Sequence, residues 1–257
     1  MRYLRRDGHT HPNIMKIPQH AADFVSAAVA AGMDELVMSD HMPFSVTGDE
    51  HDRIPAGAVG DYCRAVSECA AKYSESIRIL CGIEIDYRPE CEYEICEVLS
   101  SGSFDVVLGS SHLNIRGFGI PFGSISKDDF AEMVLENYLA AAESGMFDVL
   151  THLDVFRRTV ADTAHYPLSE PDFDLRRHES VLRHIFREME RRNIALEISA
   201  APLYQKFDDF GQYPSDNILR IASDYELRRV YGSDAHSAAY VGFAYDRLTQ
   251  YINFRKK

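Results

Sequence analysis

Six short apolar runs in this chain each carry a histidine or a carboxylate at the downstream end. Each run has the length and composition of a buried β-strand, and parallel strands that lie side by side bring their carboxyl ends together. Neutral imidazoles clustered with Asp and Glu side chains are ligands for divalent transition metals. The pattern therefore predicts a parallel sheet and a metal site at one edge of it. The six segments are Asp7-Gly8-His9-Thr10-His11, Ser39-Asp40-His41, Gly82-Ile83-Glu84-Ile85-Asp86, Ser110-Ser111-His112, Thr151-His152-Leu153-Asp154 and Ser233-Asp234-Ala235-His236.

Strand-like and helix-like patterns alternate along all 257 residues. The helix-like stretches space their apolar residues three and four apart, which gathers them on one face. The clearest is Leu175–Arg192, in which Val181, Leu182, Ile185, Phe186 and Met189 form one stripe. The sequence predicts strands at 3–6, 35–39, 77–85, 105–110, 148–151, 194–198 and 228–232. It predicts further helices at 21–31, 59–73, 92–99, 130–144, 218–225 and 241–251.

Seven consecutive strand–helix units indicate parallel strands with helices packed outside them. An open doubly wound sheet and a closed barrel are both compatible with this order. An open sheet would spread the ligands along a line, whereas the strand ends of a barrel surround one mouth. The sequence therefore favours an α/β fold, a distorted seven-stranded TIM-like barrel, as a single domain over residues 1–257. The longer segments 42–58, 114–126 and 156–174 are expected to form loops over that mouth.

The composition narrows the range of partners and compartments. A net charge of −13 and a sequence pI of about 5.3 disfavour binding to nucleic acid or to an anionic membrane. No apolar stretch has the length of a signal peptide or of a membrane span. We therefore expect a cytoplasmic protein whose odd number of cysteines stays reduced. The cysteines are Cys63, Cys69, Cys81, Cys91 and Cys96.

A single His-x-His pair is weak evidence for a metal, because a histidine after a strand is commonly structural. The same placement after six different strands is hard to explain by independent structural needs. Eight ligands exceed the capacity of one tetrahedral site and suit two or three ions that share a carboxylate. Glu84, the only glutamate of the set, is the natural bridge. Paired ions can hold a hydroxide and stabilise an oxyanion, which favours hydrolysis of phosphate esters or, less often, of amides.

The order of these motifs resembles the PHP (polymerase and histidinol phosphatase) superfamily. The segments Gly82-Ile83-Glu84-Ile85-Asp86-Tyr87 and Gly109-Ser110-Ser111-His112 are similar to those of its histidinol-phosphatase branch. Two further segments also resemble that branch, Tyr213-Pro214-Ser215 and Gly232-Ser233-Asp234-Ala235-His236. The likeness runs from His9 to about Gly242 and implies the barrel fold and phosphatase chemistry.

The resemblance also implies how the ligands divide among three ions. The first ion would be held by His9, His11, Glu84 and Asp234, and the second by Glu84, His112 and His152. His41 and His236 would bind a third, with one more histidine. The branch supplies that histidine from a Cys-x-His-Gly segment, which this chain lacks. His20 is the candidate replacement, or it only begins the first helix. The catalytic residues implied are Glu84, Asp234 and His236.

Phosphate binding needs arginine as well as metal, because a planar guanidinium matches two phosphate oxygens. Arg157, Arg158, Arg53 and Arg116 fall in the predicted mouth segments and are the expected substrate contacts, with a solvated surface charge as the alternative.

Arg228 and Arg229 are expected at the opposite end of the barrel. His51 and His165 are loop residues, and His178 and His184 are expected to be solvated on their helix. Asp40 and Asp154 either orient the imidazoles, bind a metal themselves, or cap the turns after their strands. The candidates for contact with the rest of the substrate are Asp86, Tyr87, Glu197 and Tyr204.

The combined prediction is a metal-dependent phosphatase that uses a metal-bridged hydroxide on a small phosphorylated metabolite. By resemblance, the substrate is L-histidinol phosphate, which is hydrolysed to L-histidinol in histidine biosynthesis. Three alternatives stay open: a phosphoesterase for a nucleotide or sugar phosphate, an inactive metal-binding PHP module, and an amidohydrolase. No Lys occupies a strand end, as the amidohydrolase alternative would require. Zinc, iron and manganese all suit these ligands, and the sequence leaves the oligomeric state open.

Overall fold

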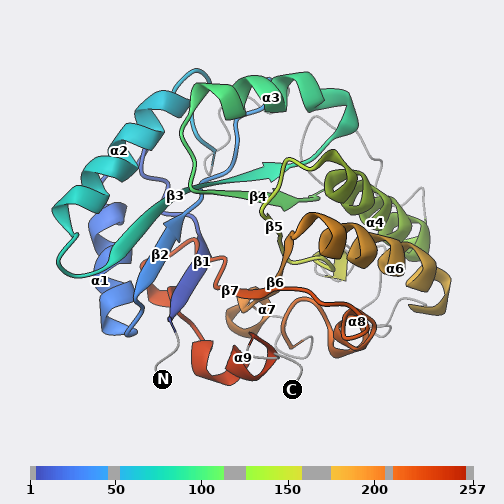
Figure 1. Cartoon of the computed structure of the whole chain (residues 1–257). Coiled ribbons are helices and arrows are strands. Elements are labelled where there is room, and N and C mark those ends of the chain that lie inside the picture. Colours follow the sequence, from blue (N-terminus) through green and yellow to red (C-terminus); the bar gives the residue numbers. More distant parts are fainter. Residues whose placement is uncertain (1–3, 46–52, 113–125, 158–174, 206–210, 253–257) are drawn as a thin grey trace.

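Seven parallel strands form one sheet in which every strand lies beside the next in chain order. The computed structural model describes residues 4–45, 53–112, 126–157, 175–205 and 211–252 (Figure 1). The strands curve into a nearly closed barrel, which confirms the predicted distorted seven-stranded architecture. They are β1 (Arg6–Thr10), β2 (Glu35–Met38), β3 (Arg78–Asp86), β4 (Val106–Ser110), β5 (Val149–Leu150), β6 (Ala195–Ser199) and β7 (Arg229–Gly232).

The first and last strands meet at the seam of the barrel. The His11 amide donates to the Ala235 carbonyl at 2.8 Å, and the Asp234 amide donates to the His9 carbonyl at 2.9 Å. Gly8 allows the close approach, because a Cβ there would lie 2.9 Å from the Tyr231 carbonyl oxygen. The seam therefore brings the two ends of the motif series, His9 and Asp234, to the same place.

Helices surround the barrel on the outside (Figure 1). Each predicted helix is present, with ends that differ by a few residues. In the described residues, no helix has the length and apolar character that crossing a membrane requires. The helices are α1 (His20–Ala30), α2 (Val59–Lys72), α3 (Glu92–Ser101), α4 (Lys127–Ser144), α6 (Leu175–Arg192), α7 (Ala201–Tyr204), α8 (Asp216–Ala222) and α9 (Tyr245–Ile252), with short 3₁₀ helices η1 (Pro89–Cys91) and η3 (Ala238–Tyr240).

The core lies between these helices and the sheet. β2 and β6 are buried along their whole length, as strands covered on both faces should be. On α6 the buried side chains recur three and four positions apart, so the predicted stripe faces the barrel. The buried residues of this stripe are His178, Leu182, Ile185, Phe186 and Met189.

His178 was expected to be solvated, and that prediction is wrong. It is 1% exposed because it lies four residues, about one turn, before Leu182 on the buried face of α6. Its Nε2 atom lies 3.8 Å from an oxygen of Asp128 on α4. His184, on the side of the same helix, keeps 45% of its side chain exposed.

The first strand was predicted at 3–6 and instead runs from Arg6 to Thr10, so that His9 lies inside it. This segment is polar but buried, so it lacks the apolar pattern by which the other strands were predicted. Its polar groups are satisfied internally: the Asp7 carboxylate accepts from the amides of Ser233 and Gly242, and Thr10 Oγ1 donates to the Val37 carbonyl. The last helix begins at Tyr245 rather than at 241.

A test of the core is Leu182→Ala. Leu182 is fully buried, so its truncation removes apolar contacts and leaves a cavity. We expect the free energy of unfolding to fall by about 2–5 kcal/mol, measured by urea denaturation. The control is Arg187→Ala on the exposed face of the same helix, which should change it by less than about 0.5 kcal/mol. Equal effects of the two changes would contradict the orientation of α6.

Candidate metal centre

The carboxyl ends of the strands gather imidazoles and carboxylates into one buried cluster. His9 lies in β1, His11 follows β1, and Glu84 lies in β3. His41 follows β2, His152 follows β5, and Asp234 follows β7. Each of these six side chains belongs to a residue that is at most 8% exposed. The barrel thus places ligands from most of the chain at one mouth, as strand ends of parallel barrels do.

Glu84 occupies the middle of the cluster. Its Oε2 atom lies 2.8 Å from His41 Nδ1 and 3.4 Å from the Nε2 atoms of both His9 and His11. Its Oε1 atom lies 3.0 Å from His152 Nε2. The carboxylate therefore faces four imidazoles with its two oxygens, the arrangement expected of a group that bridges two cations.

His9 and His11 direct their Nε2 atoms at one another across 2.9 Å. Asp234 Oδ1 lies 3.2 Å from His11 Nε2 and 3.7 Å from His9 Nε2. Asp234 holds this position with a left-handed backbone, φ 55°, directly after β7. Aspartate tolerates that conformation better than most residues, and such backbones are common at functional sites. His9, His11 and Asp234 form one group of donors close enough to hold an ion.

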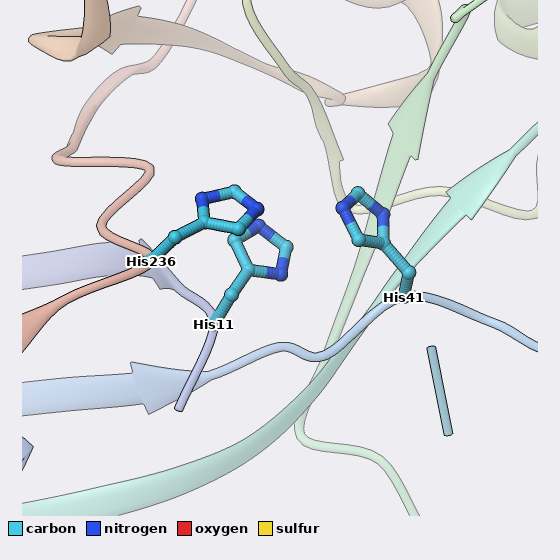
Figure 2. Close-up of side chains that lie close together, drawn as sticks. All are labelled: His11, His41 and His236. Atoms are coloured by element: carbon cyan, nitrogen blue, oxygen red, sulfur yellow. The ribbon is translucent and has the colours of Figure 1, made fainter. Parts of the chain in front are cut away.

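Two further groups share members with the first. His9, Glu84 and His152 form the second, and His11, His41 and His236 form the third. Figure 2 shows the three imidazoles of the third group reaching toward one another from three separate segments. The His11 ring stacks against both others, at centroid distances of 4.4 Å from His41 and 4.3 Å from His236. His236 is the exposed member, so the cluster opens to solvent on its side.

His112 and His20 lie differently from the rest. The His112 ring is 4.7 Å from that of His152, but it belongs to none of the three groups, and its Nδ1 lies 2.8 Å from Asp86 Oδ1. His20 begins α1, and its Nδ1 lies 3.2 Å from the Pro12 carbonyl oxygen. It too is outside the three groups. The structure therefore gives His20 the alternative role of a helix start, and ligation by His20 stays a prediction.

The charges in the cluster are coupled. Burial alone would raise the pKa of Glu84, but the His41 and His9 rings hold it well below its usual range. Burial and the neighbouring rings of His236 and His41 hold the pKa of His11 well below its ordinary value. Burial opposes a charge on His112, yet Asp86 raises its pKa to about 9. Protons and cations thus compete for the same nitrogen lone pairs.

The donor set fits divalent transition metals. His11 Nδ1 is buried and, within the described residues, has no hydrogen-bond partner, while its Nε2 faces a second imidazole and two carboxylates. The lone pair of a neutral imidazole nitrogen is repelled by carboxylate oxygens this close unless a proton or a cation lies between them. Mixed nitrogen and carboxylate donors suit zinc, iron and manganese.

The carboxylates beside the ligands have separate roles. Asp40 accepts from the amides of Asn13 and Ile14, at 2.8 and 3.1 Å, and so caps the turn after β1. Asp154 accepts from the Ser215 amide at 2.9 Å and from Arg157 at 3.2 Å. The contacts of Asp40 fit the capping of a turn, whereas those of Asp154 join the segment after β5 to the residue that precedes α8.

Two of the arginines predicted to bind substrate fall within the described residues. Arg53 is 5% exposed and donates to the Met42 carbonyl at 2.9 Å and to Asp86 at 3.3 Å. Arg157, three residues beyond Asp154, lies over the Tyr213 ring at 5.9 Å. Arg158, Arg116, His51 and His165 lie outside the described residues.

Three of the four candidates for substrate contact instead contact predicted ligands or their backbone. Asp86 contacts His112, Glu197 lies 2.7 Å from His9 Nδ1, and the Tyr204 hydroxyl donates to the Asp234 carbonyl at 2.6 Å. Sequence reasoning missed these roles. A signal was available for Glu197, since it is the one charged residue in an otherwise apolar buried strand.

Comparison with known proteins identifies the family of this chain. The profile of the PHP domain family matches residues 7–201. The chain belongs to the PHP domain family. A probable histidinol-phosphatase of Deinococcus radiodurans is 25% identical over 229 residues, with 87% of this chain and 82% of that protein covered. The histidinol-phosphatase of Bacillus subtilis is 24% identical, with 96% and 98% covered. The resemblance found in the sequence is thereby confirmed.

A solved structure shows the same fold. The histidinol phosphate phosphatase of Lactococcus lactis, complexed with zinc, L-histidinol and phosphate, superimposes with a TM-score of 0.74 at 19% identity. The alignment covers 98% of this chain and 95% of that one. The barrel of this PHP domain therefore extends beyond the residues matched by the family profile.

Glu84→Ala tests the centre of the cluster. Removing the carboxylate leaves His9, His41 and His152 without their shared anion, so we expect the purified protein to lose its bound metal and its turnover. Elemental analysis per chain is the measurement. Glu90→Gln, an exposed carboxylate on η1, is the matched control and should keep full metal content. A metal-replete Glu84→Ala protein would show that Glu84 is not a bridge.

Proposed function

We propose that this PHP domain is a metal-dependent phosphatase that hydrolyses a small phosphate monoester. The observation that carries the proposal is the position of Glu84, whose two oxygens face four imidazoles within 3.4 Å in a buried mouth. This is a donor arrangement for neighbouring divalent ions rather than for a single structural ion. The curated relatives, named as phosphatases, support the same reaction class.

Three groups of residues would hold two or three divalent transition-metal ions. When bound, such ions supply Lewis acidity and lower the pKa of water, which suits hydrolysis at phosphorus. Glu84 and Asp234 would balance only part of the charge of these ions, so that a positive field remains for the anionic phosphate group. His236, the exposed member, would with His11 and His41 hold an ion at the open side of the cluster, and this ion would supply charge stabilisation for a leaving alkoxide. The protein donors proposed are the members of these groups, His9, His11, His41, Glu84, His152, Asp234 and His236. We add His112, whose ring lies 4.7 Å from that of His152.

The specific substrate we propose is L-histidinol phosphate, which gives L-histidinol and phosphate in histidine biosynthesis. Support comes from the names of relatives that match over most of their own length. The zinc, L-histidinol and phosphate of the Lactococcus lactis structure support zinc as the metal and this ester as the substrate. Iron and manganese would satisfy the same donors.

Arg157 is our candidate phosphate ligand among the described arginines. It follows the His152 segment, and Asp154 and the Tyr213 ring fix its guanidinium at this end of the barrel. A fixed guanidinium loses little entropy when it binds two phosphate oxygens. Arg53, Arg116 and Arg158 stay predicted substrate contacts, with Arg53 already bonded to Asp86.

The deciding experiment is phosphate release by the purified protein from a panel of esters, with metal content measured on the same sample. We expect the highest kcat/KM for L-histidinol phosphate, compared with nucleotide and sugar phosphates. A higher kcat/KM for another ester would support the phosphatase activity but identify that ester as the substrate. Full metal content without hydrolysis of any ester would overturn the proposed activity.

Arg157→Ala should lower kcat/KM by about 10- to 100-fold, the effect of losing one charge-assisted hydrogen bond to phosphate. Metal content should be unchanged, because Asp154, the ion-pair partner of Arg157, is not a member of the three donor groups. Steady-state kinetics are the measurement. Arg220→Ala, an exposed arginine on α8, is the control and should match the unaltered protein. An equal loss of kcat/KM in both variants would show that Arg157 does not bind the substrate phosphate.

A further inference from the structure

Glu197 is a charged side chain in the middle of a fully buried strand. It lies in β6, which reads Ala-Leu-Glu-Ile-Ser, and it is 1% exposed. Burial of a carboxylate is costly unless both oxygens find donors. Glu197 meets that condition, since Oε1 lies 2.7 Å from His9 Nδ1 and Oε2 accepts from the His152 amide at 2.7 Å.

The contact with Oε1 determines which nitrogen of His9 can bind a cation. A carboxylate oxygen only accepts, so His9 Nδ1 must carry the hydrogen. The lone pair available to a metal is then on Nε2. That nitrogen points into the cluster, 2.9 Å from His11 Nε2 and 3.4 Å from Glu84 Oε2.

The contact with Oε2 reaches a second ligand by its backbone. The His152 amide is held to Glu197, and its ring places Nε2 3.0 Å from Glu84 Oε1. His9 and His152 come from opposite parts of the chain, β1 and the end of β5. One side chain on β6 thus sets the ring of one ligand and the main chain of another.

Gly232 provides the space that this arrangement needs. A Cβ at position 232, the last residue of β7, would overlap Glu197 Oε1 and would lie 2.9 Å from Glu197 Cδ. It would also lie 2.8 Å from His9 Cβ. A side chain as small as alanine would therefore push Glu197 away from His9.

We propose that Glu197 is a positioning residue of the metal centre, which holds His9 in the tautomer that presents Nε2 and fixes the backbone of His152, with Gly232 as its required neighbour. The inference rests on the metal centre of the proposed function and adds to it a residue that does not bind the ion. Carboxylates that accept from the remote nitrogen of a metal-bound imidazole raise its basicity and fix its orientation.

Glu197→Gln is the sharpest variant, because it keeps the shape and changes one oxygen to NH₂. The His152 amide is an invariant donor, so the glutamine oxygen must face it and the NH₂ group must face His9 Nδ1. His9 would then have to accept at Nδ1 and carry its hydrogen on Nε2, where it blocks a ligand bond. We expect zinc affinity to fall by about 10- to 100-fold in chelator competition.

The control is Glu35→Gln. Glu35 is a second buried strand glutamate, 3% exposed, but it begins β2 at the other end of the barrel and pairs with Arg6 and Arg78. Its amide variant should keep the zinc affinity of the unaltered protein. Gly232→Ala, with Glu197 intact, should reproduce the loss seen in Glu197→Gln.

A second readout does not depend on activity or on any Glu197 variant. In zinc-loaded protein labelled with ¹⁵N-histidine, the ring assigned to His9 by its absence in His9→Gln should carry its proton on Nδ1. A proton on Nε2, or unchanged zinc affinity in Glu197→Gln, overturns the inference. If the ring proton is on Nδ1 and zinc affinity drops, but no phosphate ester is hydrolysed, the positioning role stands and the proposed activity fails.

Discussion

The charge of Glu84 is the constraint around which the barrel is arranged. A fully buried carboxylate is costly unless positive or hydrogen-donating groups surround it closely. Here those groups are imidazoles carried by β1 and by the segments that follow β1, β2 and β5, each within 3.4 Å. Register errors between these strands would separate an imidazole from the carboxylate. The same side chain that organises the ligands therefore also selects the pairing of the sheet.

Buried polar strands carry much of this organisation. β1 is polar along most of its length, yet it is buried because Thr10 finds a partner on β2 and Asp7 finds one in the segment after β7. β6 carries Glu197 under the same condition. Polar groups in a dry interior are stable only when every donor and acceptor is paired. Because every donor and acceptor must be paired, these strands can adopt only one register. They are therefore rigid supports for the predicted ligands.

Much of the fold and of the cluster could be predicted from the sequence. Strand–helix alternation gave the barrel, and residues such as His41 and His152 stood out because they follow apolar runs. The limits of β1 were missed because a polar strand has no apolar pattern to detect. His178 was misjudged because its burial depends on α4 packing against α6. The role of Glu197 required three-dimensional distances, since its partners are 188 and 45 positions away in the chain.

The seam between β1 and the segment after β7 has a consequence for folding during synthesis. Ser233 donates to Asp7 across 226 positions, so these two segments can join only after both have left the ribosome. Until then a nascent chain displays its imidazoles and carboxylates as separate weak chelators. The full set of candidate donors is thus assembled late in folding, once the segment after β7 has joined β1.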